Sequence, residues 1–254
     1  MPTDPLFYVV GLSTIFLISF GKGAFGGGLA LIGVPLLALV VDPITATIMM
    51  APLISASDPF GVMAYPPRTW SWEDLRWLVP GMLVGVALGA LFFVWVDPRI
   101  VTLGIAIITL WFVARWFVGG GSRKMTGLPV QPVKALVCAA LSGFTTFIAH
   151  SGNPPIAFYL LPRGLPKTVY AGTLMAFFII GNTAKLGLYI WLRGHDPAIL
   201  WKVAVLIPAV PPGVWLGRYL HDRIAEPRLY LMCYLLVAVT GLKLLYDSLR
   251  SLLM

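Results

Sequence analysis

The sequence predicts an all-α polytopic membrane protein with two homologous halves, each made of a broken or re-entrant helix and about four transmembrane helices, or about 8–10 membrane segments in total. Hydrophobic residues make up 59% of the 254 residues and charged residues only 11%, whereas soluble domains carry about 25% charged residues. Residues 77–96, 203–217 and 229–242 contain no charged residue. A span needs about 20 mostly apolar residues. Because these runs are continuous rather than alternating, helices are favoured over a β-barrel.

An internal repeat is the third observation behind this fold class. Residues of the same or similar type recur in the same order in the two halves of the chain. The matched residues are Pro43 with Pro166, Thr45 with Thr168, Asp58 with Asn182, Pro80 with Pro208, Gly85 with Gly213 and Gly89 with Gly217. We therefore expect residues 1–118 to form a first transmembrane repeat, 119–132 a glycine-rich linker, and 133–254 a second transmembrane repeat.

The individual helices follow from the apolar runs and from the proline and glycine positions between them. The first half predicts helices at about 6–20, 43–66, 77–96 and 99–117, and the second at about 133–148, 166–192, 199–219 and 227–249. The first helix is expected to be retained, since the N-terminus lacks the basic segment of a signal peptide.

Each half is interrupted after its first helix, at 21–28 and 143–155. The apolar pieces that follow, 29–41 and 156–162, are too short or too broken for ordinary spans. Whether these pieces cross or re-enter decides between inverted and parallel repeats, and the basic residues of the loops fit both.

Breaks at matching positions of two repeats predict a ligand site. A break frees backbone amide groups, and the restarting helix directs its positive N-terminal end at the gap, which is an arrangement that binds anions. Gly26, Gly27 and Gly28 in the first half, and Ser151 and Asn153 in the second, are therefore candidate substrate-binding residues. The alternative is that these small residues serve close helix packing.

Ionisable side chains at membrane depth cost about 2.5–3.5 kcal/mol on insertion scales and are functional candidates by default. Lys22 and His150 lie in the two breaks, and Lys185 follows Asn182 on the same helix face. Asp58, at the position matched to Asn182, either pairs with a lysine or carries a coupling proton. This cation-rich set suits a small anionic substrate. Lys22 could instead extend to an interface, and His150 could be a structural histidine.

These observations predict a secondary transporter for a small organic anion in a bacterial inner (plasma) membrane, with protons as a candidate coupling ion. No metal or cofactor is expected, because no cysteine and histidine cluster has metal-ligand spacing. The basic residues are spread over short loops, which argues against nucleic acid as a partner. An intramembrane enzyme and a cation transporter are the alternatives. Ser151 adjoins His150, so the two cannot face each other on a helix, and Asp58 is nearly alone as an acid at depth. The oligomeric state is left open.

Glycine and proline patterns carry a resemblance to a known family over nearly the whole chain. They comprise Gly21, Gly23, Gly26, Gly27 and Gly28 followed by Pro35 and Leu36, and Pro80, Gly85 and Gly89 repeated as Pro208, Gly213 and Gly217. In these features the sequence resembles the sulfite exporter TauE/SafE family, also called the toluene-sulfonate uptake permease family. The second half departs from it at 150–155, where a histidine, a serine and two prolines replace a glycine run. The resemblance implies transport of small anions such as sulfite or sulfonates, by import in some members and by export in others.

Overall fold

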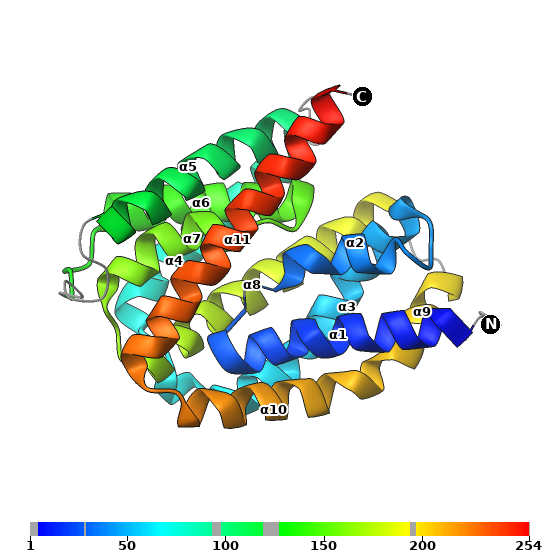
Figure 1. Ribbon diagram of the computed structural model, residues 1–254, viewed down its shortest axis with the longest axis horizontal. Helices are drawn as coiled ribbons and strands as arrows, with labels where there is room; N and C mark the ends of the chain where they lie inside the picture. The colour runs from blue at the N-terminus through cyan, green and yellow to red at the C-terminus, as the bar shows by residue number, and fades with distance from the viewer. Residues whose placement is uncertain (1–4, 28, 93–97, 119–126, 194–196, 254) are drawn as a thin grey trace. The chain divides into compact units, whose positions relative to one another are not determined.

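A computed structural model of the protein describes residues 5–27, 29–92, 98–118, 127–193 and 197–253, and helices are the only regular elements within these ranges. Six helical segments of this described part are long and apolar enough to cross a membrane, and α3 and α6 supply two shorter apolar helices. The expected all-α polytopic membrane fold is confirmed. The helices are α1 (Pro5–Phe25), α2 (Gly33–Leu37), α3 (Pro43–Ala64), α4 (Trp72–Phe92), α5 (Pro98–Val118), α6 (Pro132–Ala149), α7 (Asn153–Leu160), α8 (Lys167–Arg193), α9 (Pro197–Leu206), α10 (Val210–Arg223) and α11 (Glu226–Leu253) (Figure 1).

The two interruptions are shorter than the sequence predicts. Helix α1 continues to Phe25 and α6 to Ala149, so Lys22 and Gly143 lie inside helices and not in breaks. Packing of these turns against neighbouring helices offsets the low helix propensity of glycine. The segments that follow contain α2, of five residues, and α7, of eight. At 1.5 Å per residue neither helix crosses a hydrocarbon core of about 30 Å.

The single helix expected at 199–219 is interrupted near its middle. A 3₁₀ turn at Ile207–Ala209 separates α9 from α10. Pro208 lies in this turn and has no N–H to continue the α-helical hydrogen bonds.

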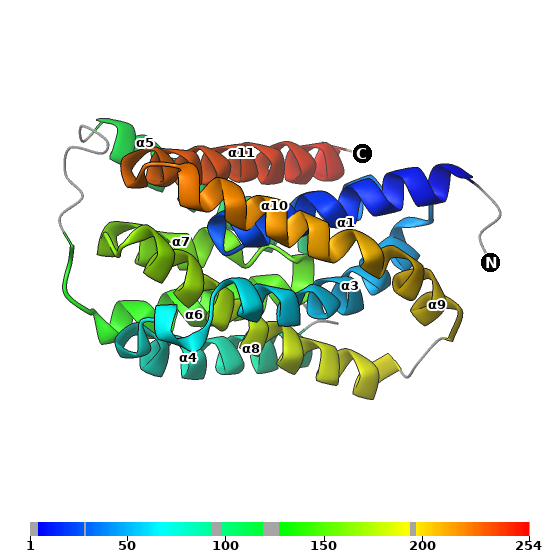
Figure 2. The same ribbon diagram turned by 90° about the horizontal axis from the view of Figure 1, so that it is seen from below.

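The chain forms two compact units, and each contains parts of both halves of the sequence. The first unit consists of Met1–Trp70 and Ala171–Ile224, and the second of Ser71–Tyr170 and Ala225–Met254. Within the first unit α1 lies along α10. Within the second unit α4 lies along α6 and α5 along α11 (Figures 1 and 2). Each unit is therefore built from helices of both proposed repeats. The linker residues 119–126 lie outside the described residues.

Both the α1–α10 pair and the α4–α6 pair come into close backbone contact at glycines, as is common in membrane helices. A side chain at any of these glycines would crowd or overlap atoms of the neighbouring helix. The backbone contacts are those of Gly213 with Phe16, Gly217 with Phe20, Gly85 with Ala140, and Gly89 with Phe144. These are the glycines that repeat in the sequence, and their partners follow the same order in α1 and α6. The correspondence supports the proposal that 1–118 and 133–254 are structural repeats.

The second long helices of the two halves, α3 and α8, run antiparallel within the first unit. Asp58 contacts Asn182, and Gly61, one turn further along α3, lies against Met175 of α8. Rising residue numbers on α3 therefore meet falling numbers on α8. Since Asp58 and Asn182 are matched positions of the repeat, this arrangement favours inverted over parallel repeats, a choice that the sequence left open.

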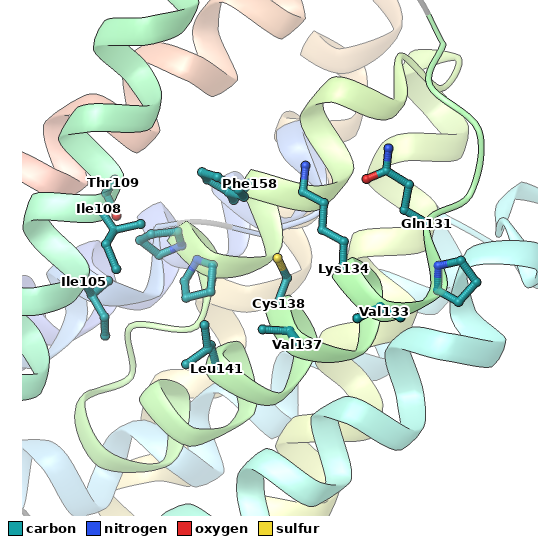
Figure 3. A pocket seen from close by; sticks show the side chains of 13 residues that line it. Ile105, Ile108, Thr109, Gln131, Val133, Lys134, Val137, Cys138, Leu141 and Phe158 are labelled. Atoms are coloured by element: carbon teal, nitrogen blue, oxygen red, sulfur yellow. The ribbon is translucent and has the colours of Figure 1, made fainter.

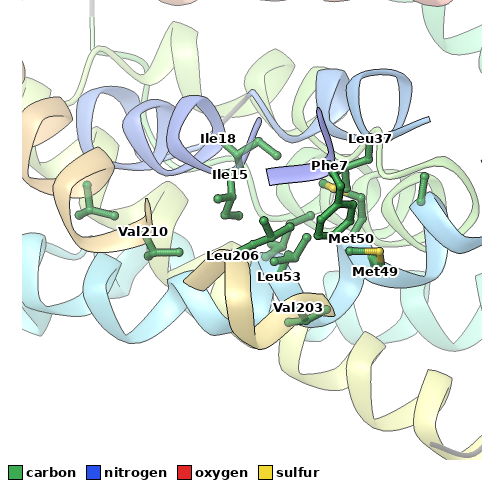
Figure 4. Packing of buried hydrophobic residues seen from close by; sticks show 13 residues of the cluster. Phe7, Ile15, Ile18, Leu37, Met49, Met50, Leu53, Val203, Leu206 and Val210 are labelled. Atoms are coloured by element: carbon green, nitrogen blue, oxygen red, sulfur yellow. The ribbon is translucent and has the colours of Figure 1, made fainter. Parts of the chain in front are cut away.

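The hydrophobic core of the first unit lies between α1, α3 and the α9–α10 segment (Figure 4). Its buried side chains include Phe7, Ile15, Ile18, Leu37, Met49, Met50, Leu53, Val203, Leu206 and Val210. Ile54 of α3 belongs to the same cluster and borders the polar residues described next.

Candidate functional site

Four polar side chains of the first unit lie together in its interior. Lys22 of α1, Asp58 of α3, and Asn182 and Lys185 of α8 are each at most 5% exposed. They come from three helices and from both halves of the sequence. All four were predicted as site residues from the sequence, and we call them the charged cluster.

Lys22 is held entirely by partners inside the protein. Its Nζ donates a hydrogen bond to the carbonyl oxygen of Ile54 at 2.8 Å and forms a buried ion pair with Asp58. The hydroxyl of Ser57 donates to the same carbonyl at 2.6 Å. Pro59 lies in the next turn of α3, and because proline has no N–H it cannot donate the helical hydrogen bond to the carbonyl of Ser55, the residue after Ile54. The ammonium group of Lys22 thus faces buried acceptors and not an interface.

Asp58 of α3 contacts cluster residues on both of the other helices, α1 and α8. Its Oδ2 accepts a hydrogen bond from Asn182 Nδ2 at 3.2 Å, while its Oδ1 pairs with Lys22. Lys185 lies close enough for its charge to interact with those of both Asp58 and Lys22. Buried ions are costly unless they are paired and hydrogen-bonded. Within the described part of the chain, the cluster combines two lysines with one aspartate.

Gly26 and Gly27 end the first helix. Both have positive φ, +79° and +146°, and their N–H groups donate to the carbonyls of Lys22 at 3.0 Å and Gly21 at 3.3 Å. This is a left-handed C-cap, for which glycine is the favoured residue. In this structure the two amides donate to carbonyls of the helix end; a role for Gly26 and Gly27 in binding an anion stays a prediction. Gly28 lies outside the described residues.

The end of α6, in the second unit, has the same local geometry as the end of α1. His150 adopts the left-handed conformation, with φ of +51°, and its N–H donates to Thr146 O at 3.2 Å. The N–H of Ser151 donates to Thr145 O at 3.3 Å. His150 and Ser151 therefore cap α6 as Gly26 and Gly27 cap α1, which again matches the two halves.

The N-terminus of α7 is poorly suited to binding an anion through amide groups. Asn153 begins the helix and is followed by Pro154 and Pro155, neither of which has an N–H. Two of the amides on which such a site depends are thus missing. The Oδ1 of Asn153 is buried and has no hydrogen-bond partner among the described residues. Since His150, Ser151 and Asn153 belong to the second unit, their place in one site with the charged cluster stays a prediction.

Two buried side chains that sequence reasoning missed hold the end of α1. The hydroxyl of Tyr65 donates to the carbonyl oxygen of Gly23 at 2.5 Å, and Nδ1 of His221 lies 2.8 Å from that of Ala24. Because a carbonyl oxygen only accepts, Nδ1 of His221 carries the proton. The two rings also touch edge to face, with centroids 5.4 Å apart. The last carbonyls of a helix need such donors, but no motif in the sequence marks these two residues as the source.

The fold is that of a multi-pass α-helical membrane protein, and ionisable residues buried between membrane helices, as in the charged cluster, are typical of the transporter class. The chain belongs to the Sulfite exporter TauE/SafE family, which it matches over residues 11–244. This confirms the resemblance carried by the glycine and proline patterns. The family comprises membrane transporters of sulfite and related sulfur anions and is not an enzyme family. No curated protein and no solved structure matches the chain.

Proposed function

We propose that the protein is a secondary transporter that moves a small sulfur-containing or organic anion, such as sulfite, a sulfonate or a carboxylate, across a bacterial inner membrane. The observation that carries this proposal is the charged cluster, in which Lys22 and Lys185 outnumber the single carboxylate of Asp58 at full burial. A bound anion balances the excess positive charge. The ammonium groups and the Asn182 amide supply hydrogen-bond donors for its oxygen atoms.

The position of the cluster supports a transport role. Asp58 and Asn182 are matched residues of the two proposed repeats, and they touch where α3 and α8 cross. Transporters built from inverted repeats bind their substrates where the repeats meet. The family membership independently indicates a sulfur anion as the cargo.

Asp58 gives this site a physical route to proton coupling. When Asp58 is ionised, its carboxylate forms an ion pair with Lys22, so a substrate anion competes with it for the same ammonium group. Protonation of Asp58 removes both the competition and the carboxylate's repulsion of the anion. A proton and an anion then bind to the same state of the protein, and the two move together in one direction.

Uptake into liposomes tests this function. The purified protein is reconstituted, and the flux of labelled sulfite, a sulfonate and a carboxylate is measured with and without a proton gradient. Replacing Lys185 with alanine should lower the flux at least about tenfold, because a hydrogen bond to a charged group contributes about 1.5–3 kcal/mol. Arg115→Ala is the control, since Arg115 is exposed and packs over the ring of Trp111.

The flux of the variants and the flux of the wild type distinguish a wrong site from a wrong function. If Lys185→Ala and Arg115→Ala both transport like the wild type, the charged cluster is not the substrate site. If the wild-type protein moves none of these anions in either direction, the proposed function is wrong.

A further inference from the structure

The second unit contains a cavity of about 680 Å³ between α5, α6 and α7 that none of the residues of the charged cluster lines. This volume lies within the range of about 300–1,000 Å³ that is typical of small-molecule sites. Its walls are mainly apolar side chains, which face one another across the gap in Figure 3. They include Ile105 and Ile108 of α5, Val137 and Leu141 of α6, and Pro154 and Phe158 of α7.

One end of the cavity is cationic. Lys134 and Gln131, at the start of α6, extend their side chains in the same direction, and Lys134 lies beside Phe158 (Figure 3). The Nζ of Lys134 lies 4.9 Å from the centre of the Phe158 ring. Lys134 forms no ion pair with any described residue, whereas Arg163 of the same unit is paired with Asp74. The first turn of α6 has no acidic residue, so the positive end of the helix adds to the charge of the lysine.

We propose that this cavity binds an anionic phospholipid, with one acyl chain along the apolar walls and the phosphate at Lys134 and Gln131. The charge is in the first turn of α6, and the apolar residues Val137 and Leu141 follow one and two turns deeper into the helix. A phospholipid has this same order of anionic group and hydrocarbon. Basic pockets between membrane helices are known to bind anionic lipid head groups.

The exposed apolar side chains of the cavity wall suit a lipid better than a soluble anion. Val137 is 54% exposed and Leu141 is 48% exposed, so this side of α6 is in contact with its surroundings along the cavity. A small sulfur anion would leave these apolar side chains without a partner, while an acyl chain covers them. The site is therefore separate in chemistry from the proposed transport site.

Native mass spectrometry of the full-length protein in mild detergent tests the proposal. The protein is titrated with palmitoyl-oleoyl phosphatidylglycerol, the matching phosphatidylcholine, and glycerol 3-phosphate as the head group without chains. The wild type should retain one phosphatidylglycerol and bind it at least about fivefold more tightly than phosphatidylcholine. Lys134→Gln should lower the affinity for phosphatidylglycerol about fivefold, the effect of one lysine near an anionic membrane surface. Lys202→Gln, on α9 of the first unit, should leave it unchanged.

A second variant tests the apolar part of the site independently of the charge. Leu141→Trp adds bulk at a half-exposed position and should weaken both phospholipids while leaving the protein folded. Three outcomes overturn the proposal: Lys134→Gln keeps the preference for phosphatidylglycerol, glycerol 3-phosphate binds as tightly as the whole lipid, or the protein is a lipid-free dimer that Leu141→Trp converts to a monomer. The last outcome would assign this face to a second copy of the chain.

Discussion

Replacing Asp58 with asparagine tests whether the charged cluster is held together as the structure shows. The substitution removes the only carboxylate among the described residues of the cluster and leaves Lys22 and Lys185 buried at 4% and 1% exposure. Breaking a buried ion pair by removing one partner typically costs about 3–5 kcal/mol, because an uncompensated charge is left inside. Lys22 retains its hydrogen bond to Ile54, which keeps the expected loss within this range and not above it.

The expected loss is large enough to measure by thermal unfolding. For a chain of this size 1 kcal/mol shifts Tm by about 2–4 °C, so Asp58→Asn should lower Tm by roughly 6–20 °C. The double variant Lys22→Met with Asp58→Asn removes both charges of the pair and should be more stable than Asp58→Asn alone by at least about 2 kcal/mol, since an uncharged pair carries no unpaired ion. Intrinsic fluorescence of the purified protein in detergent, recorded during heating, measures both values.

Asp247→Asn provides the matched control. Asp247 forms an i,i+4 ion pair with Lys243 on α11, but its side chain is 47% exposed. An exposed pair of this kind contributes only about 0.3–0.5 kcal/mol, so Tm should change by no more than about 2 °C. The reasoning is refuted if Asp58→Asn melts with the wild type, or if the double variant is as unstable as the single one.

Two further predictions concern the end of α1. A side chain at Gly26 has both an unfavourable φ and an overlap with the backbone of Ala171, so Gly26→Ala should cost at least about 2 kcal/mol. Gly104→Ala in α5, where an added side chain meets no atom within 4 Å, should leave stability unchanged or raise it by up to about 1 kcal/mol. Thermal unfolding of both variants measures this, and equal losses would contradict it. Tyr65→Phe removes the donor to the buried Gly23 carbonyl and should cost about 1–3 kcal/mol. Amide hydrogen exchange should show faster exchange at the end of α1 in this variant, and unchanged protection there would be evidence against the capping role.

Much of the fold could be predicted because the bilayer imposes it. Long runs without charge, such as 77–96, have few alternatives to a membrane helix. Helix α5 lies within one residue of the predicted 99–117, whereas α4 begins five residues before the predicted 77–96, and residues 93–96 lie outside the described part of the chain. The ends of α1 and α6 could not be predicted in the same way. Gly23 and Gly143 suggest breaks when only local propensity is considered, but contacts with α10 and α4, respectively, keep these glycines helical. Those contacts join residues far apart in the sequence.

The members of the charged cluster could be predicted, but not the way in which they meet. Charge at membrane depth singles out Lys22, Asp58 and Lys185 from the sequence alone. The acceptor role of the Ile54 carbonyl depends on how α1 packs on the turn before Pro59, which no local pattern encodes. The glycine run was interpreted as an anion cradle, which stays a prediction; the structure adds that the amides of Gly26 and Gly27 also cap α1, because a helix that ends inside a protein needs donors and acceptors for its last turn.

The contact between Asp58 and Asn182 connects the repeat to the proposed mechanism. When two inverted repeats cross, matched positions on the crossing helices come together, so two identical residues would give a symmetric pair. Here one position is an acid and the other an amide, and the two lysines come from unmatched positions, Lys22 on α1 and Lys185 on α8. Two matched aspartates would have balanced the lysines and left no charge for an anion. An asparagine at one of the two positions keeps the hydrogen bond between α3 and α8 and leaves two lysines against a single aspartate, which is the imbalance on which the proposed anion site depends.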